Sequence, residues 1–213
     1  MYQLSVEASR AYQNLYDNFN GLRDSWAAYW GKLAETFAQY DNLLGYDLMN
    51  EPFAGDIYRN PFLLIPGVAD RVNLQKFYEE GAHAIRKYDQ RSIVMIEGVT
   101  WDNFKVGFTD VPGGRVYANR TAISYHYYPS GPYLFPMAST FRERLADAKR
   151  LGCGMMMTEF DGPNSFRSQW DIVEVADRYL QRYHHISVIL KSIAGQRGNT
   201  SPLFSRRVVE TIC

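Results

Sequence analysis

The chain has 213 residues, of which 46% are hydrophobic and 22% are charged, a composition that can bury a sizeable core and excludes an intrinsically disordered chain. Its 23 lysines and arginines balance its 23 aspartates and glutamates. This balance argues against nucleic acid as a partner, because phosphate contacts need a basic surplus. Only Cys153 and Cys213 are present, so a disulfide scaffold and a multi-cysteine zinc site are excluded.

The first part of the chain predicts loop and helix, followed by one strand. Residues 1–20 show no firm period and are interpreted as loop with some helix. From Asp24 or Ser25, either of which can cap a helix, large apolar residues recur at spacings of four and three and predict an amphipathic helix. These residues are Trp26, Trp30, Leu33, Phe37 and Tyr40. An apolar run over 43–49 then predicts a buried strand.

The remainder of the chain alternates helices with short apolar strands. In chain order, the patterns predict a helix over 70–88 that Asp70 caps, strands over 92–98 and 121–125, a helix over 138–151, a strand over 154–158, a helix over 168–183 and a strand over 186–190. Such alternation is typical of α/β architecture with a parallel sheet.

The number of strands indicates an incomplete barrel. A complete (β/α)8 TIM barrel needs eight strands and about 250 residues, whereas the patterns predict five strands preceded by one helix. We therefore expect the C-terminal part of a (β/α)8 TIM barrel, about strands 4–8, with the first three strands missing. Residues 1–213 are expected to form one partial catalytic domain without a linker.

Two strands end in a glutamate. The run over 43–53 ends in Asn50, Glu51 and Pro52, and Pro52 is expected to hold Glu51 in an extended conformation. The run over 154–162 has the same design and contains Glu159. Hydrolysis of a glycosidic bond by two carboxylates needs a facing pair such as this. A separation of about 5 to 5.5 Å between the two carboxyl groups indicates retention of configuration. The alternative is that each glutamate caps a loop or pairs with an arginine.

Other polar and aromatic residues follow the predicted strands. His126 and Tyr128 alternate and are expected to share one face of an extended segment, where Tyr128 can donate to a carboxylate and His126 can bind a sugar hydroxyl or a backbone carbonyl. Trp101 can stack on a sugar or a lipid chain, or pack within its loop. Glu97 is interpreted as a supporting ion-pair residue, and Asp47 as structural.

Four motifs occur in order along most of the chain: residues 45–53 (GYDLMNEPF), 97–101 (EGVTW), 124–128 (SYHYY) and 158–160 (TEF). In these motifs the sequence resembles glycoside hydrolase family 5, and within it the animal-type endoglycoceramidases. The resemblance implies a retaining mechanism with Glu51 as acid/base and Glu159 as nucleophile. Asn50, His126, Tyr128 and Trp101 are predicted to bind substrate, and no metal or cofactor is predicted. The implied substrate is a glycosphingolipid, cleaved between oligosaccharide and ceramide.

The resemblance also gives a role to two apolar loops and suggests a location. Loops 53–66 and 129–137 are expected to shelter ceramide chains or to contact a membrane surface. The family resemblance implies a secreted or lysosomal protein, although the chain shows no signal peptide of its own. No hydrophobic run reaches the roughly 18 to 20 residues of a membrane helix.

The chain departs from the family pattern in two places. The family supplies an arginine and a histidine from strands two and three, which nothing upstream of residue 25 provides, and a tryptophan at strand eight, which residues 182–191 lack. Losing such contacts is expected to cost activity. Two alternatives therefore stay open: a related β-glucosidase acting on glucosylceramide or steryl glucosides, and an inactive glycolipid-binding fragment.

Overall fold

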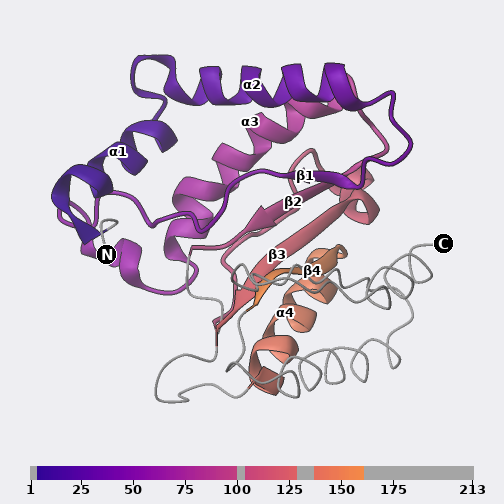
Figure 1. Cartoon of the computed structure of the whole chain (residues 1–213). Helices are drawn as coiled ribbons and strands as arrows, with labels where there is room; N and C mark the ends of the chain where they lie inside the picture. Colours follow the sequence, from indigo (N-terminus) through magenta and orange to yellow (C-terminus); the bar gives the residue numbers. More distant parts are fainter. Residues whose placement is uncertain (1–3, 100–103, 129–136, 161–213) are drawn as a thin grey trace, which may run out of the picture.

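Four parallel strands organise the part of the chain that this computed structural model describes, residues 4–99, 104–128 and 137–160 (Figure 1). The strands pair in chain order, which confirms the predicted parallel α/β sheet. They are β1 (Gly45–Asp47), β2 (Ile93–Glu97), β3 (Thr121–Tyr127) and β4 (Gly154–Phe160). The helix predicted over 168–183, the strand predicted over 186–190 and loop residues 129–136 lie outside the described residues.

Strand β1 is shorter than the apolar run that predicted it. Its ladder with β2 covers Gly45 to Asp47, and the N–H of Leu48 adds one more hydrogen bond to the carbonyl of Met95. A Cβ atom on Gly45 would lie 2.1 Å from the carbonyl oxygen of Ile93. Glycine is therefore required at this position, because any larger residue would clash with the backbone of β2.

The helices before β1 begin at positions that the sequence analysis did not predict. Helix α1 (Val6–Tyr16) occupies much of the segment interpreted as loop with some helix, and the Ser5 hydroxyl caps it by accepting the Ala8 N–H. Helix α2 (Leu22–Phe37) has Gly21 in the left-handed region as its N-cap. The prediction that Asp24 or Ser25 caps α2 is wrong, because both residues lie inside the first turn.

Helix α2 lies across α3 (Gln75–Arg86) on one side of the sheet (Figure 1). The indole ring of Trp26 stacks on Phe77 with ring centroids 3.8 Å apart. Helix α4 (Met137–Leu151), close to its predicted bounds, lies beside β3 and β4 at the other edge of the sheet (Figure 1). Among the described residues, no helix is both long and apolar enough to cross a bilayer.

The two faces of the sheet bury different side chains. Side chains on the helix side join one large core that includes Val94, Ile96 and Ile123. The opposite face carries a smaller cluster of Met95, Ala122 and Met156. Because side chains alternate along a strand, the face that carries Met95 continues to Glu97, at the carboxyl end of β2. There, Ser124 donates to Asp47 at 3.2 Å, consistent with the structural role expected for Asp47.

The loop after Glu51 is only partly exposed. Phe53 and Leu63 are buried, which corrects the expectation that they contribute to an apolar surface. Phe62, Leu64 and Ile65 are 68%, 39% and 51% exposed. The short 3-10 helix Pro61–Leu64 produces this division, because it turns Leu63 into the core and its neighbours outward.

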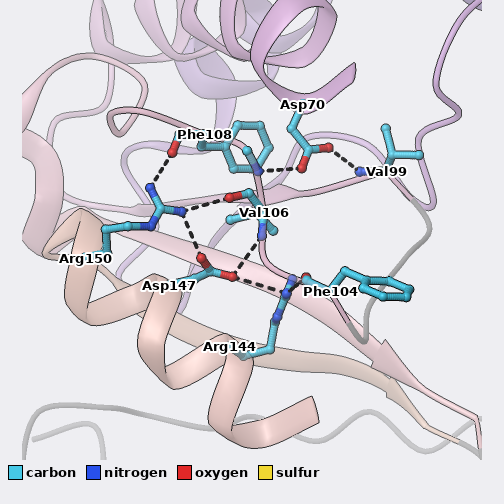
Figure 2. A network of polar contacts seen from close by, with 9 residues as sticks. Asp70, Val99, Phe104, Val106, Phe108, Arg144, Asp147 and Arg150 are labelled. Atoms are coloured by element: carbon cyan, nitrogen blue, oxygen red, sulfur yellow. Dashed lines mark hydrogen bonds and ion pairs between the residues drawn. The ribbon is translucent and has the colours of Figure 1, made fainter. Parts of the chain in front are cut away.

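Asp70 does not cap a helix, contrary to the prediction. The chain makes one π-helical turn over Asp70–Leu74 before α3. The Asp70 carboxylate instead accepts the backbone N–H groups of Val99 at 2.8 Å and Gly107 at 2.7 Å (Figure 2). A buried carboxylate with two backbone donors fixes the segment that follows β2.

A buried ionic network ties this same segment to α4. Figure 2 shows the Asp147 carboxylate between Arg144, at 3.2 Å, and Arg150, at 2.8 Å. Asp147 also accepts the Val106 N–H at 3.0 Å. The two arginines donate to the carbonyls of Phe104, Val106 and Phe108. Residues 104–108 are therefore held by charge-assisted hydrogen bonds, which are stronger than neutral ones.

Replacing Asp147 with alanine is expected to destabilise the protein by about 3 to 5 kcal/mol, because it leaves the buried Arg144 without its carboxylate. Urea unfolding measures this loss. The matched control is Asp41→Ala, since Asp41 pairs with Arg91 at 3.6 Å where both side chains are largely exposed; its cost should stay below about 1 kcal/mol. Equal losses in the two variants would contradict the assignment.

Burial raises the pKa of Asp70 above its ordinary value of 3.8, and this effect outweighs the two backbone N–H groups that lower it. The folded state therefore keeps the Asp70 proton to a higher pH than the unfolded state does. The stability of wild type relative to Asp70→Asn should fall as pH rises from below 3.8 through the raised pKa. Unfolding free energies across acidic pH test this, and a difference that does not change with pH would contradict it.

Candidate active site

Acidic and aromatic side chains gather where the strands end. Glu97 is the last residue of β2, His126 and Glu159 are each one residue before the ends of β3 and β4, and Glu51 follows β1 by four residues. In parallel α/β barrels the carboxyl ends of the strands form the face that carries the chemistry. His126 pairs in register with Glu159 next to a shift in the ladder at Tyr125.

The imidazole of His126 lies among three carboxylates. Its Nδ1 is 2.9 Å from Oε1 of Glu51, 3.7 Å from Oε2 of Glu159 and 3.8 Å from Oε1 of Glu97. The His126 side chain is 2% exposed. Only the contact with Glu51 has hydrogen-bond length, so the nitrogen orients Glu51. The arrangement places three carboxyl groups around one buried ring.

Glu159 is held by a tyrosine. The hydroxyl of Tyr128 donates to Oε2 of Glu159 at 2.5 Å. The rings of Tyr128 and His126 also make an edge-to-face contact, with centroids 5.9 Å apart and planes at 90°. The prediction that His126 and Tyr128 share one face is therefore confirmed. One carboxylate thus bonds to the histidine and the other to the tyrosine.

The backbone of Glu51 differs from the prediction. Its φ angle is 45°, in the left-handed region, so the expectation of an extended conformation before Pro52 is wrong. The reason is tertiary: the N–H of Glu51 donates to Oε2 of Glu97 at 2.9 Å. Sequence reasoning gave Glu97 only a supporting ion pair. The sequence feature that could have indicated this role is that Glu97 is an acidic residue at the end of an otherwise apolar strand, β2.

The candidate residues differ in their access to solvent. The side chains of Glu51 and Glu159 are 33% and 18% exposed, Tyr128 is 40% exposed, and Asn50 is exposed beside Glu51. Glu97 is 1% exposed. A ligand can therefore reach the two outer carboxylates but not Glu97. Trp101 lies outside the described residues.

Glu51, His126 and Glu159 could together offer three ligand atoms to a cation, since these atoms lie within 4.8 Å of one another. Hydrogen bonds already account for their arrangement: Glu51 bonds to His126, and Glu159 bonds to Tyr128. The spacing therefore follows from direct hydrogen bonding between side chains. It places two carboxylates, from opposite edges of the sheet, around one shared space.

The chain belongs to a family of glycoside hydrolases. Residues 6–190 match the cellulase family, glycosyl hydrolase family 5. Two curated relatives are endoglycoceramidases: one from Hydra vulgaris is 47% identical over 184 residues, and one from Cyanea nozakii is 43% identical over 186 residues. The matches cover 86% and 85% of this chain but 35% and 37% of those proteins, so the chain spans about a third of their length.

Solved structures share the fold. Endo-glycoceramidase II from Rhodococcus sp., in an iminocyclitol complex, is 21% identical with a TM-score of 0.73, and the match covers 92% of this chain and 47% of that one. Structures of that bacterial protein include a lactosyl-enzyme intermediate and a complex with ganglioside GM3. The described strands β1 to β4 are thus consecutive strands of a family 5 barrel.

Proposed function

We propose that this chain carries the two catalytic carboxylates of a retaining glycoside hydrolase that cleaves the β-glycosidic bond between oligosaccharide and ceramide in glycosphingolipids. The carrying observation is that carboxylate oxygens of Glu51 and Glu159 lie within 4.8 Å of each other. Retaining enzymes place their carboxyl groups about 5 to 5.5 Å apart, whereas inverting enzymes need about 6.5 to 9.5 Å for a water molecule. The endoglycoceramidase relatives support the substrate class.

In the first step, protonated Glu51 donates its proton to the glycosidic oxygen while the Glu159 carboxylate attacks the anomeric carbon. The bond to ceramide breaks, and the sugar becomes an ester on Glu159. In the second step, Glu51 takes a proton from water, and the resulting nucleophile attacks the anomeric carbon and releases the oligosaccharide. Each carboxylate returns to its starting state, so no other reactant is required.

The neighbouring residues suit this chemistry. Tyr128 bonds to one oxygen of Glu159, which leaves the other free to attack. His126 holds Glu51 through Nδ1, so it acts through Glu51 and not by reaching the sugar from its buried position. The carboxylate of Glu159 favours the positive charge that develops on the sugar in the transition state. Asn50, exposed beside Glu51, is available to bind a sugar hydroxyl.

The loop that follows Glu51 supports a lipid-contacting role. Phe62, Leu64 and Ile65 are exposed together on one short turn. Arg59 and Arg71 flank this turn and are exposed, whereas Asp70 is buried. An apolar surface with basic neighbours suits a lipid interface. We include in the proposal that this surface, formed by Phe62, Leu64 and Ile65, contacts the ceramide chains or the membrane that carries them.

The hydrolase proposal is tested by mechanism-based labelling. A 2-deoxy-2-fluoro-lactosyl donor with a dinitrophenyl leaving group should attach one sugar to Glu159, detected by mass spectrometry of the peptide that contains it. Glu159→Gln should abolish the label, and the matched Glu80→Gln, on the exterior helix α3, should keep it. The label persists because the fluorine at C2 destabilises the oxocarbenium-like transition state through which the covalent intermediate is hydrolysed.

Two other outcomes separate the alternatives. Release of glucose alone, instead of an intact oligosaccharide, would favour a β-glucosidase acting on glucosylceramide or steryl glucosides. Binding of glycolipid without any labelling would contradict the hydrolase and favour a glycolipid-binding protein. A secreted or lysosomal location stays a prediction, which localisation of the tagged natural gene product would test.

The lipid-contacting surface is tested with Phe62→Ser and Ile65→Ser. Each should lower kcat/KM on ceramide substrates about tenfold, the effect of losing one buried apolar side chain, and should leave soluble aryl glycosides unchanged. Val116→Ser is the matched control, since Val116 is 78% exposed on a different segment, the 3-10 helix Arg115–Arg120. Equal losses on both substrate classes would count against a lipid contact.

A further inference from the structure

We infer that Glu97 is a positioning residue for Glu51, and that its carboxylate holds the backbone of Glu51 in the conformation the acid/base role requires. The inference rests on the proposed function, because it assigns Glu97 a part in the work of Glu51. Its carrying observation is the 2.9 Å hydrogen bond from the N–H of Glu51 to Oε2 of Glu97. Glu97 acts from inside the protein and does not touch substrate.

Glu51 needs such a partner because its conformation is unfavourable. Its φ angle of 45° lies in the left-handed region, which residues other than Gly, Asn and Asp seldom adopt. Pro52 adds a further restriction on the residue before it. The ladder between β1 and β2 ends at Asp47, so Glu51 lies beyond the sheet. A strained residue persists when its surroundings fix it, and the Glu97 carboxylate supplies that constraint.

Glu97 is itself fixed on both sides. The hydroxyl of Tyr78, on α3, donates to the carbonyl of Glu97 at 2.8 Å. Two residues further along, Asp70 accepts the N–H of Val99 at 2.8 Å, as Figure 2 shows. The Glu97 side chain is 1% exposed. The core therefore holds Glu97 in one position. Through its hydrogen bond to the N–H of Glu51, Glu97 restricts the backbone of Glu51.

The contact between Glu97 and His126 is the weaker one. Oε1 of Glu97 is 3.8 Å from Nδ1 of His126, whereas Glu51 is 2.9 Å from the same nitrogen. A separation of 3.8 Å is beyond hydrogen-bond length. Glu51 is thus held at two points, at its N–H by Glu97 and at its carboxylate by His126. These two bonds together define the direction of its side chain.

The direct test measures amide hydrogen exchange at Glu51 in wild type, Glu97→Gln and Glu97→Met. Glutamine keeps an oxygen that can accept the N–H, while methionine has a similar volume and no comparable acceptor. Exchange at Glu51 should be about 10- to 100-fold faster in Glu97→Met, as expected for losing a hydrogen bond to a charged group, and less than tenfold faster in Glu97→Gln. The Leu48 amide, bonded to Met95, serves as the internal control and should not change.

A kinetic test separates positioning from a general loss of stability. Proton donation matters for poor leaving groups and little for dinitrophenyl glycosides. Glu97→Met should therefore lower kcat/KM at least tenfold more on alkyl glycosides than on dinitrophenyl glycosides, and Glu97→Gln should restore most of the activity on alkyl glycosides. Glu51→Ala is the reference for this leaving-group dependence.

These experiments distinguish a failure of the positioning role of Glu97 from a failure of the proposed hydrolase function. If Glu51→Ala shows the leaving-group dependence but Glu97→Met does not, the positioning role is wrong and the hydrolase stands. If Glu51→Ala shows none, the acid/base assignment itself fails. Unchanged Glu51 exchange in Glu97→Met, or equal acceleration at Glu51 and Leu48, would also overturn the inference, because Glu97 would then have no specific effect on Glu51.

Discussion

The parallel pairing of β1 to β4 is the constraint on which the site depends. All four strands run in the same direction, so Glu51 and Glu159, which are 108 positions apart in sequence, lie at the same carboxyl end of the sheet. The alternation of side chains then divides the strands between the helix-side core and the face that carries Met95 and Glu97. No local element could assemble this site, because Glu97, His126 and Glu159 come from three different strands and Glu51 comes from the segment after β1.

Rigid support surrounds β2, the second strand of this sheet. Asp70 and Asp147 hold the segment after β2 from the helix side (Figure 2), and Tyr78 bonds to the end of the strand itself. These buried side chains form hydrogen bonds with backbone atoms. A buried polar group that loses its hydrogen-bond partner costs free energy, so these bonds favour a single geometry. As a result, the buried Glu97 is held in place and bonds to the N–H of the more exposed Glu51.

The division between buried and accessible acids fits a hydrolase. Glu51 and Glu159 reach solvent and face each other, whereas Glu97 and His126 are buried and hold Glu51. The exposed turn of Phe62, Leu64 and Ile65 follows Glu51 within fifteen residues, so the same loop that carries the proposed acid also offers an apolar surface. The proposed hydrolysis of glycosphingolipids uses both properties.

The sequence by itself determined the order of the strands, the parallel sheet and the two glutamates that follow or end strands, because apolar runs and their alternation with helical periods are local properties. It did not determine the left-handed backbone of Glu51, the burial of Leu63 or the partner of His126. The backbone of Glu51 and the partner of His126 depend on contacts between residues 46 and 75 positions apart, from Glu51 to Glu97 and from Glu51 to His126, and Leu63 is buried by packing into the core. Only the tertiary structure decided them, since a hydrogen bond across the sheet can outweigh the preference of a single residue.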